Sequence, residues 1–132
     1  MTNSILIGKI IYSKLSSSET LTTMLGEENK IFPIIADNDA KYPFVVYKRL
    51  SVSSTEVTKD GFGEDLVSFE ITVVTNNYVG SLNIANEIRK ILEKKKIESN
   101  IMNIYNNKIQ NISEDYVGDA YVQKLIFTCN IN

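Results

Sequence analysis

The stretch from Tyr42 to Lys96 reads YPFVVYKRLSV, then SSTEVTKDGFG, then EDLVSFEITVVTNN and finally YVGSLNIANEIRKILEKKK. The first and third pieces alternate β-branched and aromatic residues with polar ones, which is typical of β-strands. The second is polar and contains two glycines, and the fourth repeats its apolar residues at helical spacing. The stretch predicts a strand, a long loop, a second strand and a helix. We expect the other segments to pack on this unit or to extend its sheet.

The two predicted strands differ in how cleanly they alternate. In the second strand, Glu64 to Thr75, alternate residues are apolar, which predicts one core-facing side. The first strand, Phe44 to Val52, alternates imperfectly, so both of its faces are expected to be partly covered. The helix is expected to close at residues 94–96, three lysines placed where its dipole favours cations. The predicted core residues are Val67, Phe69, Ile71 and Val73 of the strand and Val79, Leu82, Ala85, Ile88 and Leu92 of the helix, whose apolar stripe is widened by Ile84 and Ile91.

Two helices and a short extended segment are predicted before this unit. The first helix covers residues 4–16, with Ser4 as its N-cap and an apolar face formed by Ile7, Ile10, Ile11 and Leu15. The second begins at Ser18 as N-cap and ends before Gly26, a natural helix stop. Residues 31–36 follow as an extended segment. Because Pro33 lacks a backbone N–H, this segment is expected at a sheet edge or crossing the sheet.

The last third of the chain predicts a hairpin. Two strands, within residues 101–116 and 121–131, are joined by a turn at residues 117–120. Uneven alternation at Ile109 and Ile112 predicts a bulge in the earlier strand. The pattern leaves open whether residues 100–111 form strand or loop.

The order of these elements predicts an α+β fold in a single domain spanning residues 1–132. We expect a mostly antiparallel sheet of four to five strands, with the helices packed on one face. Residues 1–26 would supply the N-terminal helices, and residues 30–131 the sheet and the central helix. A chain of 132 residues is long enough to bury a core without a disulfide or a metal.

The composition argues against catalysis and against metal binding. The chain has no histidine and one cysteine, so it lacks the commonest general base and the usual zinc ligands. No glycine-rich phosphate loop, dinucleotide fingerprint or nucleophile–base pair occurs, and Cys129 is expected to be a buried, inert thiol. We therefore predict no enzymatic activity, no cofactor and no metal. No apolar run is long enough for a membrane span.

Two surface features are candidates for binding. The basic cluster of Arg89, Lys90 and residues 94–96 could meet phosphates, but a solvated helix end with a favourable dipole sign is the preferred interpretation. A net charge of −2 also argues against a broadly basic nucleic-acid binder. The loop from Ser53 to Gly63 is the stronger candidate, because long loops without regular structure are often functional, although a flexible hairpin tip without a role explains it about as well. Its predicted protein-contact residues are Thr55, Glu56, Val57, Thr58, Lys59, Asp60 and Phe62.

In order and spacing, residues 30–131 resemble the tail-completion and tail-terminator family of tailed bacteriophages and prophages. The resembling pieces are Ile31-Phe32-Pro33 with Ala36, Tyr42-Pro43-Phe44-Val45-Val46-Tyr47, Asp60-Gly61, Phe69-Glu70-Ile71-Thr72-Val73, Ala85 with Ile88 and Arg89, and a closing strand. These motifs are hydrophobic and structural, and it is their combination that is specific. The Asn-rich segment Asn100–Asn111 is longer and more polar than the family pattern.

The resemblance implies a virion protein that closes into a ring, usually a hexamer, at the head-proximal end of the tail. Such a ring terminates the tail tube and contacts the tube protein and a head-completion or connector protein. Genomic DNA would pass through its lumen without specific binding. The protein would be assembled in the cytoplasm of the bacterial host, and neighbours would be contacted by the loop and by the edge of the second long strand.

Three other interpretations remain open at this point. The chain could be a head-completion or connector adaptor, or an adaptor of a contractile injection apparatus. A nucleic-acid-binding module that uses the basic helix end is the third. Salt-dependent DNA binding would favour the third, whereas a concentration-dependent ring would favour the terminator.

Overall fold

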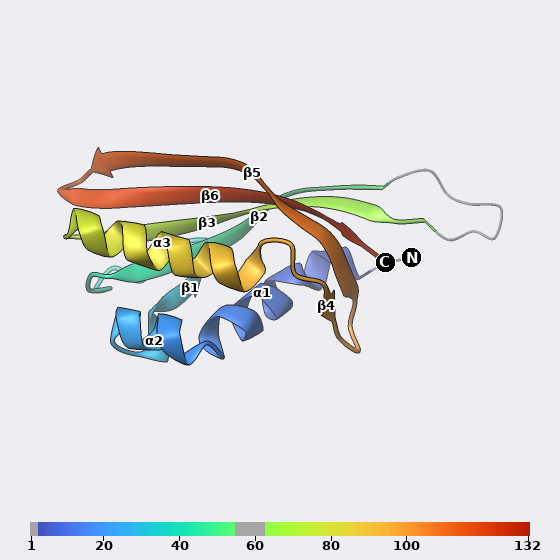
Figure 1. Ribbon diagram of the computed structural model, residues 1–132, viewed down its shortest axis with the longest axis horizontal. Helices are drawn as coiled ribbons and strands as arrows, with labels where there is room; N and C mark the ends of the chain where they lie inside the picture. Colours follow the sequence, from blue (N-terminus) through green and yellow to red (C-terminus); the bar gives the residue numbers. More distant parts are fainter. Residues whose placement is uncertain (1–2, 55–62) are drawn as a thin grey trace.

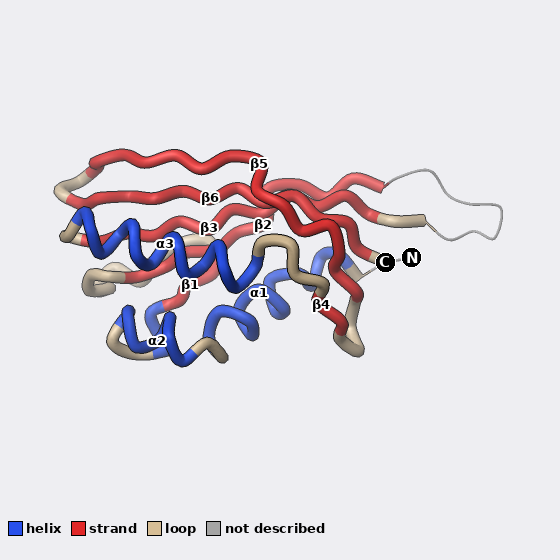
Figure 2. The backbone as a smooth tube through the Cα atoms, viewed as in Figure 1, coloured by secondary structure: helices blue, strands red, loops and turns tan. Residues whose placement is uncertain are grey.

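The computed structural model describes residues 3–54 and 63–132 and shows a six-stranded sheet with the α-helices on one face (Figures 1 and 2). The strand order is β1-β2-β3-β6-β5-β4, and only the β1–β2 pair is parallel. The strands are β1 (Ile31–Pro33), β2 (Phe44–Ser54), β3 (Asp65–Thr75), β4 (Ile97–Glu98), β5 (Asn103–Val117) and β6 (Ala120–Ile131).

The α+β class and the mainly antiparallel sheet are confirmed, but the predicted count of four to five strands is wrong. The sheet has six strands because two very short ones, β1 and β4, cover parts of its two edges. β1 lies within the extended segment predicted at residues 31–36, whereas β4, with two residues, is too short to carry a recognisable alternation. The edge position expected for Pro33 is confirmed.

The centre of the sheet is the pairing of β3 with β6, which runs without a register shift from Asp65–Ile131 to Thr75–Tyr121. Phe69 and Phe127 lie opposite each other in this pairing and stack with ring centroids 5.0 Å apart. The predicted core face of β3 is confirmed, since its four predicted residues are all buried. The edge of this second long strand was expected to contact a neighbour, and that expectation is wrong. β3 is hydrogen-bonded on both sides, so it has no free edge.

The N-terminal segment forms a short 3-10 turn, η1 (Ser4–Leu6), that continues into α1 (Ile7–Ser16) and is followed by α2 (Glu19–Leu25). The caps predicted for α2 are confirmed: Ser18 Oγ accepts a hydrogen bond from the Leu21 N–H, and Gly26 has a φ of 93°. Ser4 is not a cap. Its buried hydroxyl donates to the Asp65 carboxylate at 2.6 Å, which fastens the start of the chain to β3. A second 3-10 turn, η2 (Glu28–Lys30), leads into β1.

The central helix α3 (Tyr78–Leu92) is shorter than predicted. Its last turn is followed by Glu93 in an extended conformation and by Lys94 with a φ of 61°, so the lysines at 94–96 lie in the loop beyond the helix. Buried Asn107 from β5 donates its side-chain N–H to the Leu92 carbonyl at 2.8 Å and thereby caps the helix end. A residue distant in sequence, not the local charge pattern, sets this boundary.

The buried face of α3 is also rotated relative to the prediction. Val79 is 60% exposed and Leu82 is 40% exposed, although both were expected in the core. The buried residues are Ser81, Ile84, Ala85, Ile88 and Leu92. Ser81 can be buried because its hydroxyl donates to the Tyr78 carbonyl and accepts from the Gln123 side chain. The hydrogen bond from Gln123 on β6 therefore explains why a serine, and not an apolar residue, faces the core at position 81 of α3.

The other long elements follow the sequence more closely. On β2, Val45 is fully buried and Tyr47 packs against Tyr12 of α1, so the helix-facing side is the one carrying these two residues. The hairpin of β5 and β6 turns at Gly118 and Asp119, whose φ values of 58° and 63° suit a two-residue turn. The bulge predicted in β5 is confirmed, with register shifts between Tyr105 and Lys108 and between Ile109 and Asn111.

The stacked Phe69–Phe127 pair generates a stability prediction. We expect Phe127→Ala to lower the free energy of unfolding by about 3 to 5 kcal/mol, because a fully buried ring is lost and the cavity cannot collapse around it. Urea unfolding followed by circular dichroism measures the change. Leu66→Ala, at a side chain 42% exposed on β3, is the control and should cost about 1 kcal/mol or less. Equal losses in the two variants would contradict this assignment of the core.

Candidate interaction surfaces

No group of side chains that could hold a metal ion is found in the described residues. No group of three histidine, cysteine, aspartate or glutamate side chains gathers within 3–54 and 63–132. Cys129 is buried on β6, and burial raises the pKa of its thiol to about 12, so it is held in the unreactive protonated form. Among the described helices, none has the length and apolar character to cross a membrane.

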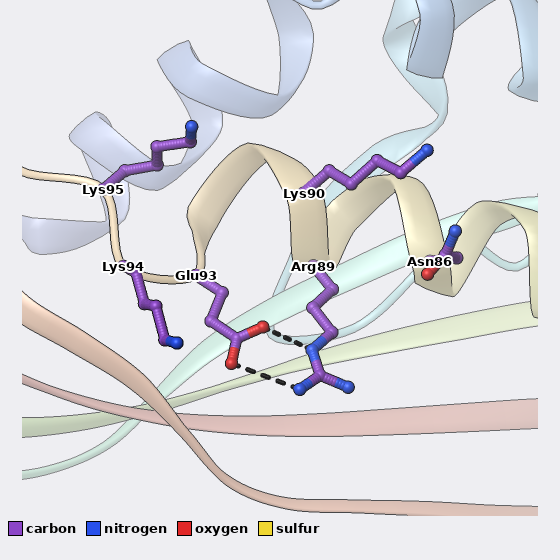
Figure 3. Close-up of a pocket in the computed structure, with 6 residues that line it drawn as sticks. All are labelled: Asn86, Arg89, Lys90, Glu93, Lys94 and Lys95. Carbon is purple, nitrogen blue, oxygen red and sulfur yellow. Dashed lines mark hydrogen bonds and ion pairs between the residues drawn. The ribbon is translucent and has the colours of Figure 1, made fainter.

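The basic cluster predicted at the end of α3 borders an open hollow of about 530 Å³ (Figure 3). Within it Arg89 is paired with Glu93 through two hydrogen bonds, one of 3.2 Å from Nη2 and a shorter one from Nε. The hydrogen bond from Arg89 lowers the pKa of the Glu93 carboxyl. Lys96 pairs with Glu98 at 3.1 Å. The cluster is partly neutralised by these acids.

The hollow does not have the composition of a single-strand binding site. Its lining consists of charged and amide side chains and contains no aromatic residue on which a base could stack: Asn86, Arg89, Lys90, Glu93, Lys94 and Lys95. In Figure 3 the side chains of Lys90 and Lys95 extend away from the Arg89–Glu93 pair. The arrangement matches a solvated helix end better than a phosphate-binding surface.

The two edges of the sheet are the most exposed regular parts of the chain. On one side, β1 pairs only with Val45–Tyr47 of β2, and every residue of β2 from Lys48 to Ser54 is exposed. On the other side, β4 pairs only with the start of β5, and every residue of β5 from Gln110 to Val117 is exposed. We call these segments the β2 free edge (Lys48–Ser54) and the β5 free edge (Gln110–Val117). Unpaired backbone groups on such edges can bind another strand.

Three tyrosines gather where β5 turns into β6. The ring of Tyr121 lies 4.9 Å from that of Tyr116 and 5.6 Å from that of Tyr78 on α3. The Tyr78 hydroxyl donates to Glu114 at 3.0 Å, which raises the pKa of Tyr78, and Gln123 donates to the same carboxylate at 2.9 Å. Glu114 is thus held in place on the helix-facing side of β5.

Exposed apolar side chains border both free edges. Tyr116 and Val117, at the end of β5, are 57% and 60% exposed. Ile34 and Ile35, just after β1, are 72% and 76% exposed. Ile34 has a φ of 68°, which is rare for a β-branched residue, and the turn is closed by a 2.7 Å hydrogen bond from the Ile35 N–H to the Pro33 carbonyl. Strained backbone positions cluster at functional sites, so this turn, with its two exposed apolar residues, is a candidate contact surface.

The contact residues predicted from the sequence lie outside the described residues. These are Thr55, Glu56, Val57, Thr58, Lys59, Asp60 and Phe62. Sequence reasoning missed the β5 free edge and the Ile34–Ile35 turn. The sequence contained a signal for the β5 free edge. Residues 110–117, QNISEDYV, contain three apolar residues but form no buried face.

The fold is shared with proteins of known structure. A chain from the virion of a native gene transfer agent particle matches with a TM-score of 0.73 over 92% of this chain and 90% of that chain, at 12% identity. A second solved chain, whose name states no role, matches with a TM-score of 0.54 over 88% of this chain and 96% of its own length, at 10% identity. No protein-family model and no curated protein matches the sequence. At these identities, the likeness shows a common fold.

The buried thiol generates a chemical prediction. In the folded chain Cys129 is expected to be unreactive toward DTNB at pH 8, because a group with a pKa of about 12 is almost wholly protonated there and is 1% exposed. In 6 M guanidinium chloride one thiol per chain should react within minutes. Absorbance of the released thiolate measures both. Rapid reaction of the folded chain would show that β6 opens readily.

Proposed function

We propose that this chain is a structural virion protein of a tailed bacteriophage, a prophage or a related particle. It would form a ring at the head-proximal end of the tail, where it terminates the tube and joins it to the head. The observation that carries this proposal is the fold shared, over nine-tenths of both chains, with a component of a gene transfer agent virion. The motif resemblance at residues 30–131 gives the more specific position in the tail.

The exposed surfaces of the chain support an assembly role. Each side of the sheet ends in a free edge, and large apolar side chains lie beside both edges. A monomer with open edges is prone to pair with other chains, and a ring can cover every edge by the same contact.

The expected partners follow from this position. The ring would contact the tail tube protein on one face and a head-completion or connector protein on the other, with the genome passing through its lumen. A hexamer is the stoichiometry that the family resemblance implies. The net charge of −2 suits a lumen along which DNA slides without binding.

Removal of the gene from the phage or prophage that encodes the chain tests the proposed position. We expect filled heads and separate tails, with tails of irregular length, because nothing stops tube polymerisation. Electron microscopy of the lysate measures both features, and expression of the intact chain in trans should restore joined particles. Unjoined tails of uniform length would instead indicate a head-completion adaptor. Normal particles without the gene product would overturn the proposal.

The loop predicted from the sequence remains part of the proposal. We expect deletion of residues 55–59 to leave the urea midpoint within error of the intact chain while impairing assembly, because this segment is polar and lies between two strands. Complementation with the deleted chain measures assembly, and circular dichroism measures folding. A large loss of stability would assign the loop to the fold instead.

A further inference from the structure

We propose that copies of this chain associate head to tail, with the β5 free edge of one copy pairing antiparallel with the β2 free edge of the next. This inference rests on the ring proposed above and names the surfaces that would form it. Its partner is a second copy of the same chain. The argument comes from the charges on the two edges, from the faces on which these charges lie, and from the direction of the strands.

The two edges carry opposite charges. The β5 free edge contains Glu114 and Asp115 and no basic residue, whereas the β2 free edge contains Lys48 and Arg49 and no acidic residue. Pairing two β2 edges would oppose cations, and pairing two β5 edges would oppose anions. Like charges directly opposite each other destabilise a strand pair, and unlike charges stabilise it. Charge therefore favours the head-to-tail contact over either symmetric contact.

The charged residues also match face by face. Lys48 lies opposite Glu70 and Arg49 lies opposite buried Phe69, so they point to the open face and the helix-covered face of the sheet respectively. On β5, Asp115 points to the open face, because Glu114 beside it bonds to Tyr78 of α3. In one antiparallel register, Asp115 lies opposite Lys48 and Glu114 lies opposite Arg49. Both pairs form at once, on the two faces of the joined sheet.

The same register also places side chains of similar character opposite each other in the part of β2 that follows Arg49. A register shift between Arg49 and Ser51 leaves Leu50 as an extra residue in β2. If the incoming strand passes this bulge as β3 does, then Ser51 lies opposite Ser113 and Val52 lies opposite Ile112. Val52 is 38% exposed and Ile112 is 39% exposed in the single chain. The pairing would bury both.

The opposite end of the contact covers the exposed apolar turn. The Ile34 N–H donates to the Tyr47 carbonyl at 2.8 Å, so the Ile34–Ile35 turn sits at the point where β1 leaves the β2 edge. Because β1 already occupies the β2 edge at Tyr47, the incoming strand can pair no further than Lys48, where its next residues reach the end of β1. Tyr116 and Val117 would then meet Ile34 and Ile35, and four of the most exposed apolar side chains of the described chain would be removed from water.

The strand directions allow this contact between copies in the same orientation. Antiparallel pairing through β3 and β6 makes β5 run opposite to β2 within one chain. The β5 free edge lies at the end of the sheet where β5 turns into β6, and the β2 free edge lies at the other end (Figure 1). When these two edges pair, each copy of the chain is shifted along the strand direction relative to the copy before it. Such a stagger is what a sheet of tilted strands needs to close on itself.

Lys48 and Asp115 are the residues to exchange, because their neighbours have roles inside the chain. Arg49 donates to the Ile5 carbonyl at 2.9 Å, and Glu114 accepts from Tyr78 and Gln123. Lys48 and Asp115 are exposed and form no ion pair within residues 3–54 and 63–132. The Asp115 carboxylate accepts one hydrogen bond, at 2.8 Å from the N–H of the adjacent Tyr116. Substitutions at these two positions should leave the fold unchanged.

The test is a charge exchange followed by analytical ultracentrifugation over a range of protein concentrations. Lys48→Asp and Asp115→Lys should each weaken association by about tenfold or more, since each opposes like charges at every contact. The double variant, and an equimolar mixture of the two single variants, should regain association to within a few-fold of the unchanged protein. Lys90→Asp, the same charge change at the end of α3, is the matched control and should have no effect.

Disulfide trapping tests the register independently. Ser51→Cys and Ser113→Cys in one chain should give a ladder of crosslinked oligomers on mild oxidation, and each single variant should give none. The two positions lie on different strands separated by β3 and β6, so they cannot join within one chain. Cys129 is buried and should not contribute.

The outcomes separate this inference from the proposed function. Rings that persist in the single charge variants and show no crosslinking would overturn the edge contact while leaving the virion role intact. Charge-dependent chains formed by a protein whose loss leaves particles normal would support the edge contact and overturn the role. An unchanged protein that stays monomeric at every concentration would overturn the edge contact.

Discussion

The fold depends on the continuous pairing of β3 with β6. Eleven-residue β3 presents alternate apolar side chains to the helices, and the opposing residues of β6 do the same. A slip of one residue would turn the Phe69–Phe127 stack away from the core, so burial of this stack fixes the register. Helix α3 contacts these two strands, and the N-terminal helices complete the same core. The outer strands are then placed by their pairing to this centre.

This dependence explains which features could be predicted from the sequence. The alternation of β3, the Ser18 cap and the turn at Gly118 each depend on neighbouring residues, and each was correctly predicted. The end and the rotation of α3 depend instead on Asn107 and Gln123, which come from strands later in the chain. A periodicity argument cannot include such partners. It therefore placed Val79 and Leu82 in the core and left the inward serine unnoticed.

The interaction surfaces were harder to predict for a related reason. A free edge is defined by the strand that is missing beside it, so recognising one requires the complete sheet order. The sequence of β5 beyond residue 110 contains apolar residues that suit a strand, and its edge is free because β4 pairs only with the start of β5. Of the loop singled out from the sequence, residues 53–63, the structure assigns residues 53–54 to β2, and residues 55–62 lie outside the described residues. The suggested role of the loop still rests on length and composition.

The charges on the two free edges distinguish a complementary edge from an identical one, which exposure alone does not. Lysine on an edge strand commonly prevents unwanted pairing, and both a bulge and two cations occur on β2. These features disfavour pairing between two β2 free edges. They do not repel the β5 free edge, which carries the carboxylates of Glu114 and Asp115. Protection against aggregation and selection of the correct partner can then come from the same residues. A heterologous contact chosen in this way closes into a ring when its rotation allows and otherwise extends without limit. The stagger between the two free edges sets the curvature of the joined sheet. That curvature would decide whether the copies close into a ring or extend into an open chain.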